Sequence, residues 1–238
     1  MNAWITGLRD VEARLSEWKG EFALFAAFLP AESTDQWDLL VSAPWARRDD
    51  HGVLKLIRDE LAGSISTDDS LLLARIVVVE TWHPDVQTLN SRVNVEHGVV
   101  PIANEEHFGY IVERGFIITS KDYWAFIKRL FPEHAEFVFF TRLGSLMIRI
   151  SWRLNDDPLR PYKRSKNIVL AISEEALEDY LYIDRPERRS AEEKLRAFVI
   201  DRLTTFDPHH DTPPDATPPQ EQWRVTSALF RHPALAVG

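Results

Sequence analysis

A strict alternation of apolar and mostly polar residues between Leu146 and Leu154 constrains the fold of this chain most. Leucine, isoleucine and tryptophan occupy every second position, and the positions between them hold Met147, Arg149, Ser151 and Arg153. Successive side chains of a β-strand point to opposite faces, so this pattern predicts a half-buried strand with a polar, basic outer face. At least part of the chain must therefore build a sheet with one covered face.

The first half of the chain mixes both periods. Apolar residues at helical spacing predict helices near residues 4–18, 53–61, 84–93 and 123–130, whereas apolar or β-branched runs predict strands at 21–29, 37–43, 71–80 and 109–120. The first two strands are close enough to form a hairpin. The β-branched run at 75–79 is typical of a central strand.

The second half differs in its order of elements. A strand at 167–172 follows the alternating one, Ser173 is placed to cap a helix, and Ser190 with Glu193 resembles a capping box for another helix. After a proline-rich stretch, Trp223 begins a last strand. We therefore predict an α+β protein with a boundary near 132–140. Residues 1–135 form a mixed α/β sheet layer covered by helices, and residues 136–238 form a smaller strand-strand-helix-helix-strand module.

Composition excludes several classes of protein. The absence of cysteine excludes disulfide scaffolds, thiolate nucleophiles and zinc sites that use cysteine. No apolar run approaches the roughly 20 residues that a membrane-spanning helix needs, and no signal peptide precedes the first helix. We therefore expect a soluble, cytoplasmic protein that does not bind membranes. The net charge of −9 argues against a general nucleic-acid binder.

Basic residues nevertheless gather in one region of the second half. Between Arg142 and Lys166 the chain has seven basic and two acidic residues. We predict an anion or partner site formed by Arg149, Arg153, Arg160, Tyr162, Lys163, Arg164 and Lys166. Clustered cations suit phosphates, and a tyrosine ring can stack on a base. A charged strand face and loop are also common on ordinary surfaces, so docking to an acidic protein surface remains an alternative.

Carboxylates and histidines suggest an alternative acid or metal site. It would consist of Asp38, Glu80, His97, His107 and Glu113, provided that the fold brings them together. Such a set resembles the carboxylates of nucleases that use metal-bound water. No spacing in it has a mechanical rationale, and carboxylates at strand ends are common by chance, so we predict no metal.

The remaining chemical motifs are weak. Asp207, His209, His210 and Asp211 are potential metal ligands, but their proline-rich context gives no fixed spacing. Ser42 ends a strand but lacks the glycines of a nucleophile elbow. No glycine-rich phosphate loop is present, so we expect no nucleotide cofactor.

Eight tryptophans are a second candidate for binding. Three of them, Trp4, Trp18 and Trp152, fall on predicted core faces. Trp37, Trp45 and Trp82 lie at strand ends or just beyond them, where a half-exposed ring can anchor a protein partner.

Two groups of segments resemble those of bacterial protein families to which we attach no activity. The first group is WDLLVSAPW at 37–45, VNVEHGVV at 93–100 and GFIITS at 115–120. The second is ISWRLNDDPLRPYKRSK at 150–166, AISEEALEDYL at 171–181 and TPPQEQWRVT at 217–226. The resemblance implies a bacterial origin and a two-part organisation, and no functional residues.

The absence of a catalytic motif beside abundant tryptophan and segregated charge favours an interaction protein without catalytic activity. We expect a protein partner or self-association, and an accessory role in a defence or toxin-neutralising system is consistent with it. The alternative is a nucleic-acid-binding protein or metal-dependent nuclease that uses the basic 149–166 region for phosphates.

Overall fold

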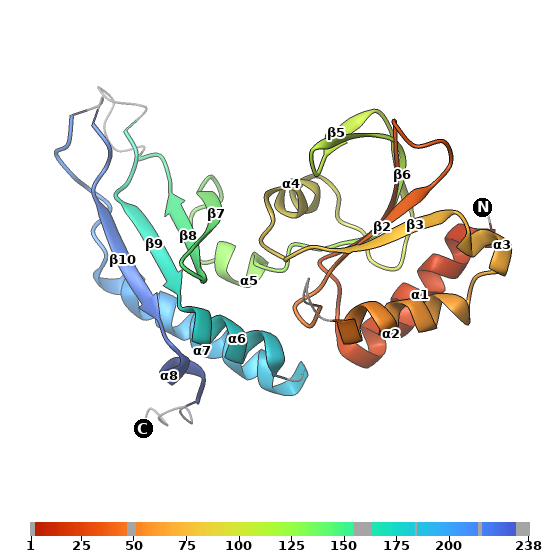
Figure 1. Cartoon of the computed structure of the whole chain (residues 1–238). Helices are drawn as coiled ribbons and strands as arrows, with labels where there is room; N and C mark the ends of the chain where they lie inside the picture. Colours follow the sequence, from red (N-terminus) through yellow and green to blue (C-terminus); the bar gives the residue numbers. More distant parts are fainter. Residues whose placement is uncertain (1–2, 47–50, 155–162, 184, 214–215, 232–238) are drawn as a thin grey trace. The chain divides into compact units, whose positions relative to one another are not determined.

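The computed structural model places most of the chain in two compact units, Met1–Tyr123 and Trp124–Gly238 (Figure 1). It describes residues 3–46, 51–154, 163–183, 185–213 and 216–231.

The first unit contains a six-stranded mixed sheet. Its strands are β1 (Leu24–Pro30), β2 (Trp37–Ser42), β3 (Leu73–Val78), β4 (Val100–Ile102), β5 (Glu105–His107) and β6 (Tyr110–Ser120). The spatial order is β3-β2-β1-β6-β4, and β5 also pairs with β6. Only β2 and β3 run parallel; the other pairs are antiparallel. The predicted hairpin of β1 and β2 is confirmed.

Helices cover both faces of this sheet. They are α1 (Ala3–Lys19), α2 (His51–Ala62), α3 (Thr67–Ser70) and α4 (Pro84–Arg92). The core on one face joins α1 and α2 to side chains such as Phe25 and Leu39, and the core on the other face joins α4 to Phe28 and Leu40.

Local signals fix the ends of two of these helices as the sequence predicts. Gly20 follows the last residue of α1 and has a φ of 116°. Glycine suits this position because it adopts a positive φ at little energetic cost. Pro84 occupies the first turn of α4, where its missing N–H has no intrahelical role.

The position of β3 differs from the prediction. A central strand was expected from its β-branched residues, but β3 lies at the edge of the sheet and pairs with β2 alone. Both faces of β3 are partly buried, which explains its β-branched and apolar residues. Burial of its faces does not determine how many strands pair with it. The prediction of a central strand is therefore wrong.

The second unit contains a four-stranded sheet and four helices. Its elements are α5 (Ala125–Lys128), β7 (Glu136–Arg142), β8 (Ser145–Ser151), β9 (Asn167–Ile172), α6 (Glu174–Tyr182), α7 (Arg185–Thr205), β10 (Gln220–Val225) and α8 (Ser227–Arg231). The strand order is β10-β9-β8-β7, and only β9 and β10 are parallel.

Aromatic packing explains why this unit begins at Trp124 rather than near residue 135. The Trp124 ring is buried and lies 5.9 Å from Phe139 of β7 and 6.5 Å from Tyr180 of α6. Phe131 packs edge-on against Phe137 at 5.6 Å. The segment before β7 thus contributes to the second core.

Sequence patterns missed or misplaced two elements of this unit. β7 was not predicted, because apolar residues occupy both of its faces and remove the alternation. The capping box of Ser190 and Glu193 is wrong, since α7 begins at Arg185 and includes both residues. Ser173 does cap α6, and its hydroxyl accepts a hydrogen bond from the Ala176 N–H.

The α+β class is confirmed, with a mixed sheet and its helices in the first half and a smaller sheet module in the second. Among the described residues, no helix is long and apolar enough to cross a membrane.

Candidate functional site

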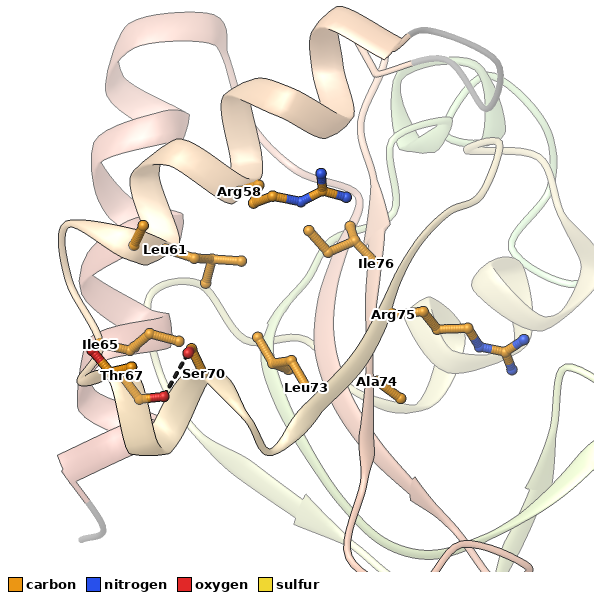
Figure 2. Close-up of a pocket in the computed structure, with 10 residues that line it drawn as sticks. Arg58, Leu61, Ile65, Thr67, Ser70, Leu73, Ala74, Arg75 and Ile76 are labelled. Atoms are coloured by element: carbon orange, nitrogen blue, oxygen red, sulfur yellow. Dashed lines mark hydrogen bonds between the residues drawn. The ribbon is translucent and has the colours of Figure 1, made fainter.

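The first unit has a groove of about 470 Å³ between α2, α3 and β3 (Figure 2). We call it the β3 groove. Its lining is mostly apolar, with two arginines and two hydroxyl-bearing residues at its margins. The lining residues are Arg58, Leu61, Ala62, Ile65, Thr67, Ser70, Leu73, Ala74, Arg75 and Ile76.

The two arginines differ in their roles. Arg58 reaches from α2 across the groove toward Ile76, and it makes no ion pair with any residue that the structure describes (Figure 2). Arg75 points away on the other side of β3 (Figure 2), where its guanidinium donates two hydrogen bonds, at 2.9 and 2.8 Å, to the buried carboxylate of Asp38. Arg58 is therefore the cation available to a molecule in the groove.

A β-bulge sets these opposite directions. Trp37 pairs with Leu73, but Asp38 pairs with Arg75, so Ala74 is the extra residue. Leu73 and Ile76 consequently face the core with α2, while Arg75 faces the side of α4.

The outer backbone edge of β3 is open in the described part of the chain. The Val79 N–H donates to the Val41 carbonyl, toward β2. Because backbone groups of a strand point alternately to either side, the N–H and C=O groups of Ile76 and Val78 point outward. The groove thus runs beside a row of strand donors and acceptors.

Asp38 has a structural role beside the groove. Its carboxylate is 3% exposed and lies near the Tyr110 hydroxyl as well as Arg75. Burial raises the pKa of Tyr110 above its usual value, and the nearby negative charge of Asp38 acts in the same direction. The bidentate arginine accounts for the burial of this carboxylate.

His107 belongs to another polar cluster, near α4. Its Nε2 lies 3.1 Å from Oε2 of Glu105, the same oxygen that accepts a hydrogen bond from Arg92 at 2.9 Å. That hydrogen bond from Arg92 lowers the pKa of Glu105. The His107 ring is buried against Phe28, and its Nδ1 has no partner among the described residues.

His97 pairs with a carboxylate that the sequence analysis missed. Its Nδ1 lies 2.6 Å from Oε2 of Glu12, which is fully buried in α1, and the Ser16 hydroxyl donates to the other Glu12 oxygen at 2.8 Å. His97 has a φ of 52°, and its N–H donates to Thr119. The only sequence feature that pointed to Glu12 is its position on the apolar side of the first predicted helix.

The five residues of the alternative acid or metal site do not share one set of contacts. Asp38 is held by Arg75, His97 by Glu12 and His107 by Glu105. Glu113 is exposed beside Arg114, and Glu80 begins the turn that leads to α4. No group of three metal-ligating side chains occurs among the described residues.

The tryptophans proposed as anchors differ in exposure. Trp37 is 8% exposed, since its ring packs against Trp4 at 4.9 Å and Phe116 at 5.5 Å. Trp45 is partly buried and donates its indole N–H to the Gly20 carbonyl. Trp82 is partly exposed. Core packing thus accounts for Trp37, whereas Trp45 and Trp82 are both of intermediate exposure.

The basic region of the second unit is only partly described, since Arg160 and Tyr162 lie outside the described residues. Arg164 is engaged by Glu136 at 2.8 Å and by the Ser151 hydroxyl. Arg149 and Arg153 are exposed, whereas Lys163 and Lys166 are partly buried. The predicted set is thus divided between an ion pair and exposed cations on the sheet.

The weaker motifs have structural explanations. His210 Nε2 lies 2.9 Å from the Arg164 carbonyl, and Asp207 accepts a hydrogen bond from the His209 N–H. The Ser42 hydroxyl is buried in the strand core, away from solvent.

Comparison with protein-family models, curated proteins and solved structures finds no match to this chain.

Proposed function

We propose that this protein is an interaction protein without catalytic activity that binds an extended segment of another protein along β3. The bound segment adds a strand to the sheet, and its alternate side chains enter the β3 groove. Main-chain hydrogen bonds then supply affinity, and the groove supplies selectivity.

The observation that carries the proposal is a strand with the composition of a central strand at the edge of its sheet. Leu73, Ile76, Val77 and Val78 keep apolar side chains on both faces, and the outward groups of Ile76 and Val78 have no strand beside them in the described chain. Edge strands of this kind are templates for another chain.

Charge defines the chemistry of the partner. The Arg58 side chain lies beside the apolar side chains of the groove and has no counter-ion among the described residues. An extended segment with alternating apolar residues and one acidic side chain would satisfy both features.

The experiment is selection of displayed random peptides on the immobilised full chain, followed by fluorescence anisotropy with the selected peptides. We expect a consensus of alternating apolar residues with an acidic one. Arg58→Glu should weaken binding about tenfold or more, as for a paired charge. Lys55→Glu on the same helix, outside the groove, is the matched control and should change affinity less than twofold.

A second variant tests the backbone. Ile76→Pro removes an outward N–H and should abolish strand addition, with circular dichroism as the check on folding. Peptides that bind wild type and both groove variants equally would overturn the proposal, as would a dimer that forms through β3 and blocks peptide binding.

A further inference from the structure

Among the residues that the structure describes, the helices of the second unit lie on one face of its sheet (Figure 1). Phe139, Ile148, Leu170 and Trp223 stand opposite one another across its four strands. Trp124, which contacts Tyr180 of α6, packs on the Phe139 end of this row, and Phe206, just after α7, packs edge-on against Trp223.

Two neighbouring rows of residues run across the opposite face of the sheet. We call this the open face, since no helix described in this unit packs on it. One row is Phe140, Met147, Ala171 and Arg224, and the other is Val138, Arg149, Val169 and Gln222. Phe140 and Val138 are 39% and 42% exposed, whereas the floor between them and the arginines is a small buried apolar cluster of Met147, Val169 and Ala171.

The charge of the open face is one-sided. Arg149 and Arg224 are exposed and form no ion pair with described residues. Beside them, Glu136 is neutralised by Arg164. The second unit as a whole has 17 basic and 17 acidic residues, and four of the acidic ones lie on α6.

We propose that the open face binds single-stranded nucleic acid. A base stacks on Phe140, and the phosphates on either side of the floor meet Arg149 and Arg224. These arginines are two strands and one row apart, roughly 10 Å across and roughly 7 Å along the sheet, so that an extended polyanion can contact both. An exposed aromatic ring beside arginines on a flat sheet suits bases better than acidic side chains, which have no flat surface to stack.

The test is fluorescence anisotropy of the full chain with labelled dT20 and U20 oligonucleotides and a 20-base-pair duplex. We expect both single strands to bind more tightly than the duplex, whose bases are unavailable for stacking. With two phosphates neutralised, raising the salt from 50 to 200 mM should weaken binding about sevenfold. The ratio of the two single-strand affinities decides between DNA and RNA.

Variants separate the open face from general electrostatics. Arg149→Glu/Arg224→Glu should weaken binding at least about tenfold, and Phe140→Ala about fivefold through lost stacking. The matched control is Arg189→Glu/Arg196→Glu on α7, which should change affinity less than twofold.

Three outcomes would overturn the proposal: no binding at 50 mM salt, equal losses in the open-face and control variants, or binding of poly-glutamate in place of the oligonucleotides. None of them bears on peptide binding at β3, which uses different residues and probes.

Discussion

At the scale of single residues, Leu143 has an unfavourable backbone. It forms the tip of the β7–β8 hairpin with Gly144, at φ values of 50° and 75°, and its side chain is 92% exposed. Such two-residue turns favour asparagine followed by glycine. Leucine gains no packing there that would offset its left-handed conformation.

Leu143→Asn should therefore raise the free energy of unfolding by about 0.5–1 kcal/mol in urea denaturation. Leu71→Asn is the control, since Leu71 is also exposed but has a φ of −70°. An equal gain in the control would show that exposure of leucine, not its backbone, causes the effect.

The Glu12–His97 pair is the second feature at this scale. Glu12 is 0% exposed, and its carboxylate depends on His97 and Ser16. His97→Ala should lower the free energy of unfolding by about 2–3 kcal/mol, less than for a fully buried pair because the imidazole is half exposed. Denaturant titration at pH 6 measures this loss.

The double variant Glu12→Gln/His97→Ala should be more stable than His97→Ala alone, since a neutral amide costs less to bury than an unpaired carboxylate. If the double variant loses the sum of both single effects, the two side chains are not coupled.

At the scale of elements, the ion pair of Glu136 and Arg164 ties edge strand β7 to the segment before β9. The hydrogen bond from Arg164 lowers the pKa of Glu136 below its ordinary value. A carboxyl with a depressed folded-state pKa stabilises the fold above its unfolded-state value, near 4.5, and loses that contribution as the pH falls.

Glu136→Gln should therefore be about 0.5 kcal/mol less stable than wild type at pH 7, a small figure because the carboxylate is largely exposed. The difference should vanish as the pH falls through the folded-state pKa. Urea titrations across that range measure it, and a difference that persists at the acidic end would contradict the assignment.

Two strands mark the limit of sequence patterns at this scale. β8 was predicted from its alternation, because leucine and isoleucine occupy one of its faces while Met147, Arg149 and Ser151 occupy the other. β7 has Phe137 and Phe139 toward the helices and Val138 and Phe140 on the open face. Its sequence therefore shows no alternation of apolar and polar residues, although it is a strand of the same sheet. The apolar residues on the open face that hid β7 are the ones that indicate a binding surface.

At the scale of the whole molecule, the boundary between the two units also separates an acidic part of the chain from a neutral one. Residues 1–123 have 11 basic and 20 acidic residues, and residues 124–238 have 17 of each, so the first unit carries the entire net charge of −9. A neutral unit with cations on one face presents those cations to a ligand without a strongly repulsive local net charge.

We expect fragments 1–123 and 124–238 to fold separately, since each has its own sheet and core. Fragment 136–238, which lacks Trp124 and Phe131, should be less stable by about 3 kcal/mol or more, the cost of losing buried aromatic side chains. Thermal unfolding, monitored by circular dichroism, compares the stabilities of the three fragments. Equal stability of the two C-terminal fragments would place the boundary near residue 135.

The sequence by itself determined the α+β class, most helices, the β1–β2 hairpin and the uneven distribution of charge, because these follow from local periodicity, caps and composition. The tertiary structure decided which strand lies at an edge, which carboxylate meets His97 and which arginines remain unpaired. These depend on neighbours far apart in the chain: Glu12 and His97 are 85 positions apart, and Asp38 and Arg75 are 37 apart. Periodicity reports whether a face is buried, but not which segment buries it, and so β3 could be recognised as a strand and not as the edge beside a groove.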